Sequence, residues 1–281
     1  MKLKSIILLT LLALTNVSLA LSKGSRNYTA NLDGLKMRVM YNIPAKFKAD
    51  TKVLFVMHGV KRNADTYRDA WKDYSDKHGF ILLVPEFDSK KFPGSNSYNL
   101  ANMNLGNGKV SDKEKWSFSL IEKIFQDVRK RLKLTTSKYH IYGHSAGAQF
   151  VHRFAIFYPE ASLDLAIAAN AGWYTALDTN ILFPYGVNKI KLDPKVIFNQ
   201  RLVVLIGSRD NDPKHKYLRT TKEAMLQGKH RLARAHYFYD LAKKKASELK
   251  LRFNWQFKVV DGVAHSNSGM AKEAIKHLMK K

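Results

Sequence analysis

The sequence predicts an α/β fold, a doubly wound and mostly parallel sheet with helices on both faces and no large lid. Apolar runs rich in β-branched residues alternate with longer segments of helical periodicity. Most of these runs are apolar on both faces, as strands in the middle of a covered parallel sheet are. No internal repeat and no Pro/Gly/Ser linker divides the chain after its first twenty residues. We therefore expect a single domain over residues 21–281.

Six segments have the composition of strands in such a sheet: 52–59, 80–87, 139–145, 163–172, 201–208 and 255–265. Two earlier extended pieces flank the turn Asn-Leu-Asp-Gly, which predicts an antiparallel hairpin at the sheet edge, near 28–30 and 36–43. Helical spacing is found over 63–78, after residue 145, through most of 214–250 and after residue 265. A further helix is predicted over 111–132, where Ser111 and Glu114 have the spacing of a capping box.

The first twenty residues have the layout of a secretory signal peptide. Two lysines precede a short apolar run, and the segment ends in Ser18, Leu19 and Ala20, which predicts cleavage after Ala20. The apolar run is short for a membrane span, so an uncleaved anchor is the less favoured alternative. The chain contains no cysteine and therefore no disulfide. We expect an exported protein, periplasmic or secreted.

The chain is strongly basic, with 48 lysines and arginines against 23 acidic residues and a formal charge of +25. Loss of Lys2 and Lys4 with the leader would leave +23. Because the basic residues are spread along the chain without a nucleic-acid-binding motif, we expect a solvated basic surface and no specific nucleic-acid partner. Such a field also predicts peripheral attraction to anionic envelope or membrane surfaces.

Residues 143–147 read Gly-His-Ser-Ala-Gly, a match to the G-x-S-x-G pattern of a nucleophile elbow. The pattern follows a predicted buried strand and precedes a predicted helix, which is the setting that such an elbow requires. Gly143 and Gly147 would remove side chains that collide where the chain reverses. Ser145 would then stand exposed above the sheet as a nucleophile.

A serine hydroxyl needs a base, and the base needs an orienting acid. Both follow later strands in the order acid, then histidine. Asp210 follows the strand at 201–208 and is the predicted acid, with Asp212 as the second choice. His265 follows the strand at 255–265 and is the predicted general base. Asp261 is nearer to His265 in sequence, but its place on the last strand or its turn makes it the poorer partner.

Acyl transfer also needs N–H donors for the developing oxyanion. Ala146, directly after the nucleophile, and Val60, in the loop after the strand at 52–59, are the predicted pair. His58 and His144 flank this site and are interpreted as packing residues. The remaining histidines, His215 among them, are interpreted as surface or packing residues. None of the histidines has the spacing of a metal site, so we expect neither a metal nor a cofactor.

Trp173 and Tyr174 lie in the segment 170–195, between two predicted strands. They are candidates for the wall of a substrate pocket, and packing of this loop onto the core is an equally weighted alternative.

Five stretches carry a resemblance to the α/β-hydrolase superfamily: 58–69, 143–154, 169–175, 207–212 and 262–270. Within it the chain resembles the secreted esterases and polyhydroxyalkanoate-depolymerase-like proteins over residues 30–281. The resemblance implies Ser145, Asp210 and His265 as the triad, and the N–H groups of Val60 and Ala146 as the oxyanion hole.

The predicted function is hydrolysis of small or medium carboxylic esters by a serine hydrolase through an acyl-enzyme. Alternatives with the same triad are a peptidase and a polyester depolymerase. A non-catalytic envelope-binding protein on a hydrolase scaffold is the less favoured alternative.

Overall fold

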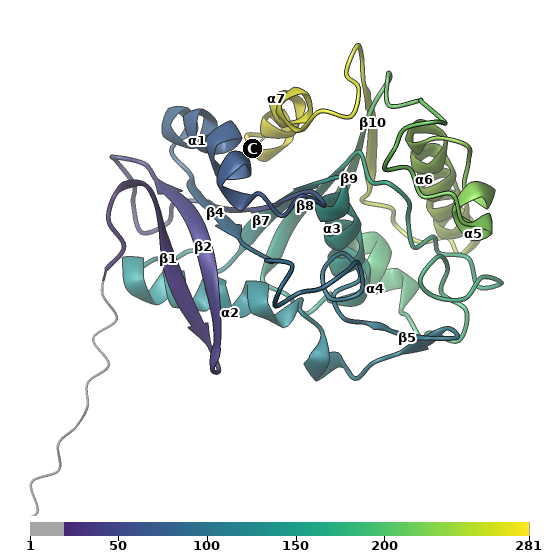
Figure 1. Ribbon diagram of the computed structural model, residues 1–281, viewed down its shortest axis with the longest axis horizontal. Coiled ribbons are helices and arrows are strands. Elements are labelled where there is room, and N and C mark those ends of the chain that lie inside the picture. Colours follow the sequence, from purple (N-terminus) through teal and green to yellow (C-terminus); the bar gives the residue numbers. More distant parts are fainter. Residues whose placement is uncertain (1–19, 281) are drawn as a thin grey trace, which may run out of the picture.

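The computed structural model describes residues 20–280, and its centre is one eight-stranded sheet. The strand order is β1-β2-β4-β3-β7-β8-β9-β10 (Figure 1). The strands are β1 (Gly24–Leu32), β2 (Leu35–Ile43), β3 (Val53–Met57), β4 (Ile81–Pro85), β7 (Tyr139–His144), β8 (Leu163–Ala169), β9 (Leu202–Gly207) and β10 (Gln256–Val260). From β4 to β10 every neighbouring pair is parallel, whereas β1 and β2 form the antiparallel edge. The predicted fold class is thereby confirmed.

Helices cover both faces of this sheet, and each face has its own apolar core. On one face α1 and α7 pack with Trp71 and Met270 in the core, and they lie above the sheet in Figure 1. On the other face α2, α3 and α6 contribute Phe125, Phe150 and Phe238. The helices are α1 (Ala64–His78), α2 (Ser119–Leu132), α3 (Ala146–Phe157), α4 (Pro194–Asn199), α5 (Lys222–Leu226), α6 (Arg231–Glu248) and α7 (Asn267–Leu278).

A small hairpin and a short helical turn lie outside the main sheet. The hairpin consists of β5 (Asn104–Gly106) and β6 (Lys109–Val110), and it is followed by a 3-10 turn at Lys113–Lys115. No helix within residues 20–280 has the length and apolar character needed to cross a bilayer. The predicted signal peptide lies outside the described residues except for Ala20, so it stays a prediction.

The predicted helix start at Ser111 is wrong, because α2 begins at Ser119. The Ser111 hydroxyl donates a hydrogen bond to the carbonyl of Asn102 at 2.7 Å instead of capping a helix. The N–H of Ser117 is likewise bonded to the carbonyl of Ala101 at 3.0 Å. The chain before α2 is therefore held to the turn at 101–102. A helix there would have to break these long-range bonds.

Several histidines are packed in the core as neutral side chains, and this makes the fold sensitive to acid. Burial lowers the pKa of His58 from 6.5 to about 4 and moves the pKa of His152 well below its usual range. At acidic pH the unfolded chain therefore binds protons at His58 and His152 that the folded chain does not bind. Stability contributed by His58 is fully present above pH 6.5 and is lost as the pH falls from 6.5 towards 4.

We expect the free energy of unfolding to decrease by about 3 kcal/mol through His58 alone over that range. Urea unfolding at pH 7.5, 5.5 and 4.5 measures the effect. His58→Gln should flatten part of the pH profile, whereas His236→Gln, at an exposed position, should leave it unchanged. A wild-type profile that is flat over this range would contradict the prediction.

Candidate active site

The end of β7 forms a sharp turn that lifts Ser145 above the sheet. Ser145 has φ 58° and ψ −114°, a conformation that non-glycine residues rarely adopt. A Cβ on Gly143 would lie 2.2 Å from the carbonyl oxygen of Gly147, and a Cβ on Gly147 would lie 2.1 Å from that of Met57. The predicted steric need for both glycines is confirmed. Any larger residue would push α3 away from the sheet.

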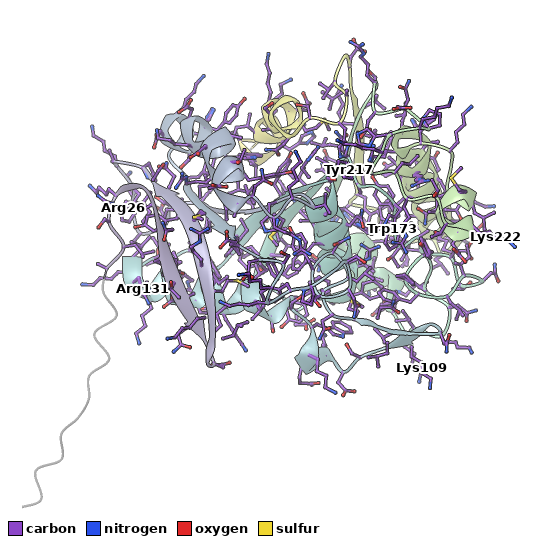
Figure 2. All side chains as sticks on the ribbon, viewed as in Figure 1. Arg26, Lys109, Arg131, Trp173, Tyr217 and Lys222 are labelled. Atoms are coloured by element: carbon purple, nitrogen blue, oxygen red, sulfur yellow. The ribbon has the colours of Figure 1, made fainter. Side chains whose placement is uncertain are left out.

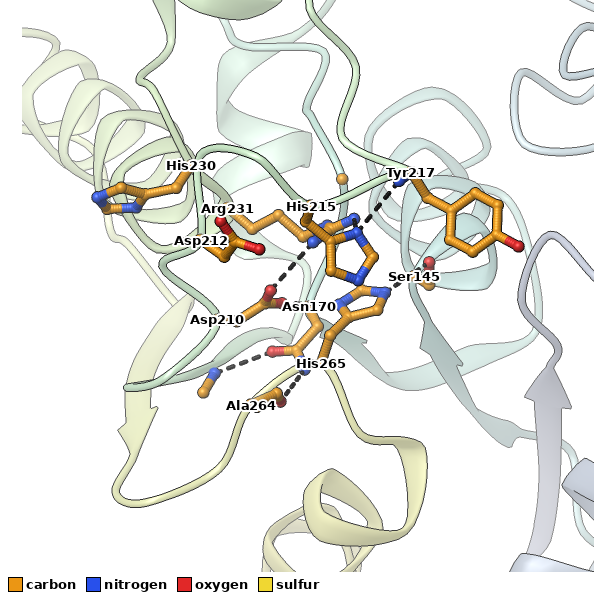
Figure 3. Close-up of polar contacts among 12 residues, drawn as sticks. Ser145, Asn170, Asp210, Asp212, His215, Tyr217, His230, Arg231, Ala264 and His265 are labelled. Carbon is orange, nitrogen blue, oxygen red and sulfur yellow. Dashed lines mark hydrogen bonds and ion pairs between the residues drawn. The ribbon is translucent and has the colours of Figure 1, made fainter.

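Three residues from the ends of three strands meet at this turn (Figure 3). The Ser145 hydroxyl lies 3.0 Å from Nε2 of His265. Nδ1 of the same ring lies 2.7 Å from Oδ2 of Asp210. When Nδ1 of His265 carries the ring proton, it donates a hydrogen bond to the Asp210 carboxylate. Nε2 is then unprotonated and can accept the proton of the Ser145 hydroxyl. The predicted nucleophile, base and acid thus stand in the order that base-assisted serine attack requires.

The two predicted oxyanion donors come from the residue after Ser145 and from the turn after β3. Ala146 is the first residue of α3, so its N–H has no partner within the helix. Val60 stands at the turn after β3, where Arg62 N–H bonds to the Gly59 carbonyl. Val60 is 56 % exposed and lines a cavity of about 270 Å³ together with Ser145 and His265. Val60 therefore lies at the same cavity as Ser145, which is a placement that an oxyanion donor requires.

A poly(aspartic acid) hydrolase from Sphingomonas sp. KT-1 is 41% identical to this chain, with a TM-score of 0.88. The match covers 92% of this chain and 100% of that one. The chain belongs to the α/β-hydrolase superfamily, in its esterase- and depolymerase-like group.

Two further solved structures extend the comparison of this α/β-hydrolase. A poly(3-hydroxybutyrate) depolymerase from Bordetella parapertussis is 28% identical with a TM-score of 0.85, covering 92% of this chain and 91% of that one. An S-formylglutathione hydrolase from Staphylococcus aureus is 14% identical with a TM-score of 0.57, covering 91% and 97%, and shares the fold. No family model and no curated protein matches the sequence.

The predicted acid of this α/β-hydrolase, Asp210, has a second partner that the sequence did not predict. Arg231, the first residue of α6, donates from Nη1 to Oδ1 of Asp210 at 3.1 Å. Both side chains are almost completely buried, at 2% and 3% exposure. The carboxylate therefore uses one oxygen for His265 and the other for Arg231. No sequence signal singles out Arg231, because it is one of many basic residues in the segment 214–250.

His144 lies beside the base of the α/β-hydrolase site as a neutral ring. Its ring centroid is 4.7 Å from that of His265, and its Nδ1 is hydrogen-bonded to the Tyr67 hydroxyl at 3.1 Å. Burial is the main cause that moves the pKa of His144 well below its usual range, and the charges of His265 and Arg231 act in the same direction. Since His144 stays uncharged, it would not repel a positive charge on His265. This placement agrees with the packing role expected for it.

Asn170 joins the two loops that carry the acid and the base. It follows β8 with φ 52° and is completely buried. Its Oδ1 accepts the N–H of Gly207 at 2.9 Å, and its Nδ2 donates to the carbonyl of Ala264 at 3.0 Å. Gly207 ends the strand before Asp210, and Ala264 precedes His265 (Figure 3). No sequence signal indicates this role, because the predicted strand at 163–172 contains Asn170, whereas β8 ends at Ala169.

We expect Asn170→Ala to lower the free energy of unfolding by about 2 kcal/mol, because the buried N–H of Gly207 and the partly buried carbonyl of Ala264 lose their partner. The same change should lower kcat by about tenfold or more, since the His265 loop is no longer fixed. Thermal unfolding and ester hydrolysis measure the two effects. Asn254→Ala is the matched control, because the Asn254 side chain bonds to the exposed end of α4 at Asn199, away from the site. Unchanged kcat in Asn170→Ala would contradict a positioning role.

The predicted pocket residues do not line the cavity, and the alternative of core packing is correct for both. Trp173 is 3% exposed, and its ring lies 4.5 Å from that of Tyr185 with the Arg153 guanidinium 4.4 Å above it. Tyr174 is fully buried and stacks on Phe238 at 4.5 Å. Stacking of large aromatic rings in the core stabilises this loop. Because both rings are packed in the core, neither can contact a substrate in the cavity.

The two competing acids stand apart from the base. Asp212 is exposed, and its carboxylate accepts the N–H of Lys214 at 2.8 Å. Asp261 is exposed at the turn after β10 and accepts a bond from the Ser208 hydroxyl at 3.2 Å. Among the described residues, no group of three His, Asp or Glu side chains is arranged to hold a metal ion.

Proposed function

We propose that this α/β-hydrolase cleaves carboxylic acyl bonds, esters in the first place, through an acyl-enzyme on Ser145. The single observation that carries the proposal is the continuous set of contacts from Ser145 through His265 to Asp210, at 3.0 and 2.7 Å. Arrangements of this kind activate serine on several unrelated folds. The strained turn at Ser145 supports it, since such strain is kept where it exposes a nucleophile.

In the proposed reaction His265 takes the proton of Ser145 as the hydroxyl attacks the substrate carbonyl carbon. The new C–O bond converts the carbonyl oxygen to an oxyanion that the N–H groups of Val60 and Ala146 stabilise. His265 then gives the proton to the leaving alcohol as the old C–O bond breaks. Water repeats the sequence on the acyl-enzyme, releases the acid and restores Ser145. Asp210 holds the ring and stabilises its positive charge throughout.

Labelling with a fluorophosphonate tests the proposal, because such probes react with an activated serine. We expect one covalent adduct, mapped by mass spectrometry to the peptide that contains Ser145. Ser268, which lies in the first turn of α7 next to the His265 loop, serves as the matched control. Ser268→Ala should still be labelled and Ser145→Ala should not. An adduct on another serine, or none on the folded wild type, would overturn the proposal.

Polymers of acids are the second candidate class of substrate. Two solved relatives with more than a quarter of their residues identical to this chain are a poly(aspartic acid) hydrolase and a poly(3-hydroxybutyrate) depolymerase. The first of these polymers is anionic, and the present chain has a formal charge of +25. Basic side chains such as Arg26, Lys109 and Lys222 project from well-separated parts of its outline (Figure 2). Long-range attraction to an acidic chain follows from such a field.

Chromatographic measurement of polymer length after incubation would decide between these substrates. Shortening of poly(aspartic acid) that disappears in Ser145→Ala supports amide cleavage in an anionic polymer. Action on small esters alone leaves the carboxylesterase proposal. We also propose that the enzyme works outside the cytoplasm, since the composition of the first twenty residues favours export.

A further inference from the structure

His215 lies at the edge of the catalytic cavity with one ring nitrogen already occupied. Its Nδ1 lies 3.1 Å from Nη2 of Arg231 and 3.2 Å from the N–H of Tyr217. Guanidinium and backbone N–H groups only donate hydrogen bonds. Nδ1 must therefore be the acceptor and carry no proton. In this geometry the neutral ring of His215 has its proton on Nε2.

The arrangement that determines this tautomer is anchored in the core. Arg231 is held by the buried carboxylate of Asp210, so the guanidinium cannot turn away from His215. Burial and the nearby charges of Arg231 and His265 lower the pKa of His215, while Asp210 and Asp212 act more weakly in the opposite direction. His215 consequently stays neutral and offers an N–H donor at Nε2.

The ring that carries this Nε2–H donor lies at the cavity where a substrate would bind. His215 lines the same cavity as Ser145 and His265, and its ring stands edge-on to His265 at 5.5 Å (Figure 3). Within residues 20–280, Nε2 of His215 has no hydrogen-bond partner and is not enclosed by protein. A free donor at the cavity wall is available to an oxygen atom of a bound molecule.

The cavity around His215 is basic. Its lining contains Lys61 and no acidic residue. Lys214 and Lys216, on either side of His215, are both exposed. Two carboxylates on this loop lie near His215. Asp210 is bonded to Arg231 and His265, and Asp212 accepts the N–H of Lys214. A neutral ester oxygen would gain little from such surroundings, whereas a carboxylate would gain from each positive group.

We propose that His215 is a substrate-binding residue that, together with Lys61, receives a carboxylate on the acyl chain of the substrate. The Nε2–H of His215 donates to one carboxylate oxygen, and the Lys61 ammonium neutralises the charge at the mouth. This inference rests on the proposed function and narrows its substrate class to acyl chains that carry a negative charge.

Two esters of equal chain length test the proposal, p-nitrophenyl monoadipate and p-nitrophenyl hexanoate. They share the leaving group and six acyl carbons, and they differ in the terminal carboxylate. We expect His215→Leu to lower kcat/KM for the monoadipate by about tenfold, mainly through KM, and to change the hexanoate by less than about twofold. Lys61→Met should cost about threefold on the monoadipate alone, because Lys61 is exposed.

Two further variants separate binding from support of the triad. His215→Gln keeps an acceptor for Arg231 and a donor for the substrate, so it should retain most of the monoadipate activity. Lys243→Met removes an exposed lysine on α6 and should affect neither ester. Equal losses on both esters in His215→Leu would overturn the proposal, since His215 would then act only through Arg231. Unchanged monoadipate kinetics would overturn it as well.

Failure of the proposed function would look different. In that case the wild type would hydrolyse neither ester, and the fluorophosphonate would leave Ser145 unlabelled. The substrate-binding proposal would then be wrong as well.

Discussion

Replacement of Ser145 by alanine is expected to lower kcat for ester hydrolysis by about 10⁵-fold while the protein folds normally. Loss of the nucleophile removes the acyl-enzyme route, and only binding and oxyanion stabilisation remain to assist water. The expected loss is close to that of removing the whole triad, because the three residues act as one unit. Alanine is also compatible with the chain at this position, because the Ser145 side chain makes no capping bond to α3.

Steady-state kinetics with p-nitrophenyl butyrate, with active-site concentration fixed by titration of the wild type, measures the change. Circular dichroism and the urea midpoint verify that the variant is folded. The turn keeps its positive φ in the variant, so a small change in stability is expected in either direction. Ser145→Ala that is folded and retains more than about one per cent of the wild-type kcat would rule out the acyl-enzyme mechanism.

The second large effect is expected from Asp210→Asn, with a decrease of about 10⁴-fold in kcat. Asparagine keeps the shape of the side chain, but it no longer offers a negatively charged acceptor to the Nδ1–H of His265. The imidazolium formed during serine attack then lacks its counter-charge. KM should change little, because Asp210 does not line the cavity.

The same variant should also be less stable, and this follows from Arg231. The guanidinium at 2% exposure loses the only carboxylate bonded to it among the described residues, and an uncompensated buried charge costs about 3 kcal/mol or more. The double variant Asp210→Asn/Arg231→Met removes both members of the pair and should recover most of the urea midpoint. Its kcat should stay as low as that of Asp210→Asn.

These two readouts separate the two roles of Asp210. Recovery of stability without recovery of activity supports an acid that orients the base and balances a buried arginine. Recovery of both would contradict the assignment, because His265 would then work without its carboxylate. If Asp210→Asn is both inactive and unfolded, the double variant measures the activity without the carboxylate, because it also removes the unpaired charge of Arg231.

Order and spacing along the chain were sufficient to place the three reacting groups. Each follows a buried strand, and the carboxyl ends of parallel strands meet at one edge of the sheet. The sequence favours Asp210 over Asp261 because Asp261 is expected on the last strand or its turn. The structure agrees with that expectation, since β10 ends at Val260 and Asp261 lies in the exposed turn that follows.

The residues that surround and support the site could not be predicted from the sequence pattern. Trp173 and Tyr174 are residue types that often line substrate pockets. In the folded protein Trp173 packs on Tyr185 and Tyr174 stacks on Phe238, so both lie in the core. Ser111 and Glu114 have the spacing of a helix cap, yet a hydrogen bond to Asn102 holds that segment out of the helix. In each case a long-range contact overrode a local preference.

By itself the sequence determined the α/β layers, the elbow at Ser145 and the succession of acid and base. These features depend on local periodicity and on two glycines whose neighbours leave no room for a Cβ. Only the tertiary structure decided that Asn170 joins the two catalytic loops, that Arg231 balances Asp210, and that His215 presents a free N–H to the cavity. Those roles arise between residues that lie far apart in the chain. Their energies depend on burial and on which oxygen or nitrogen a partner already occupies, and these exist only in the folded molecule.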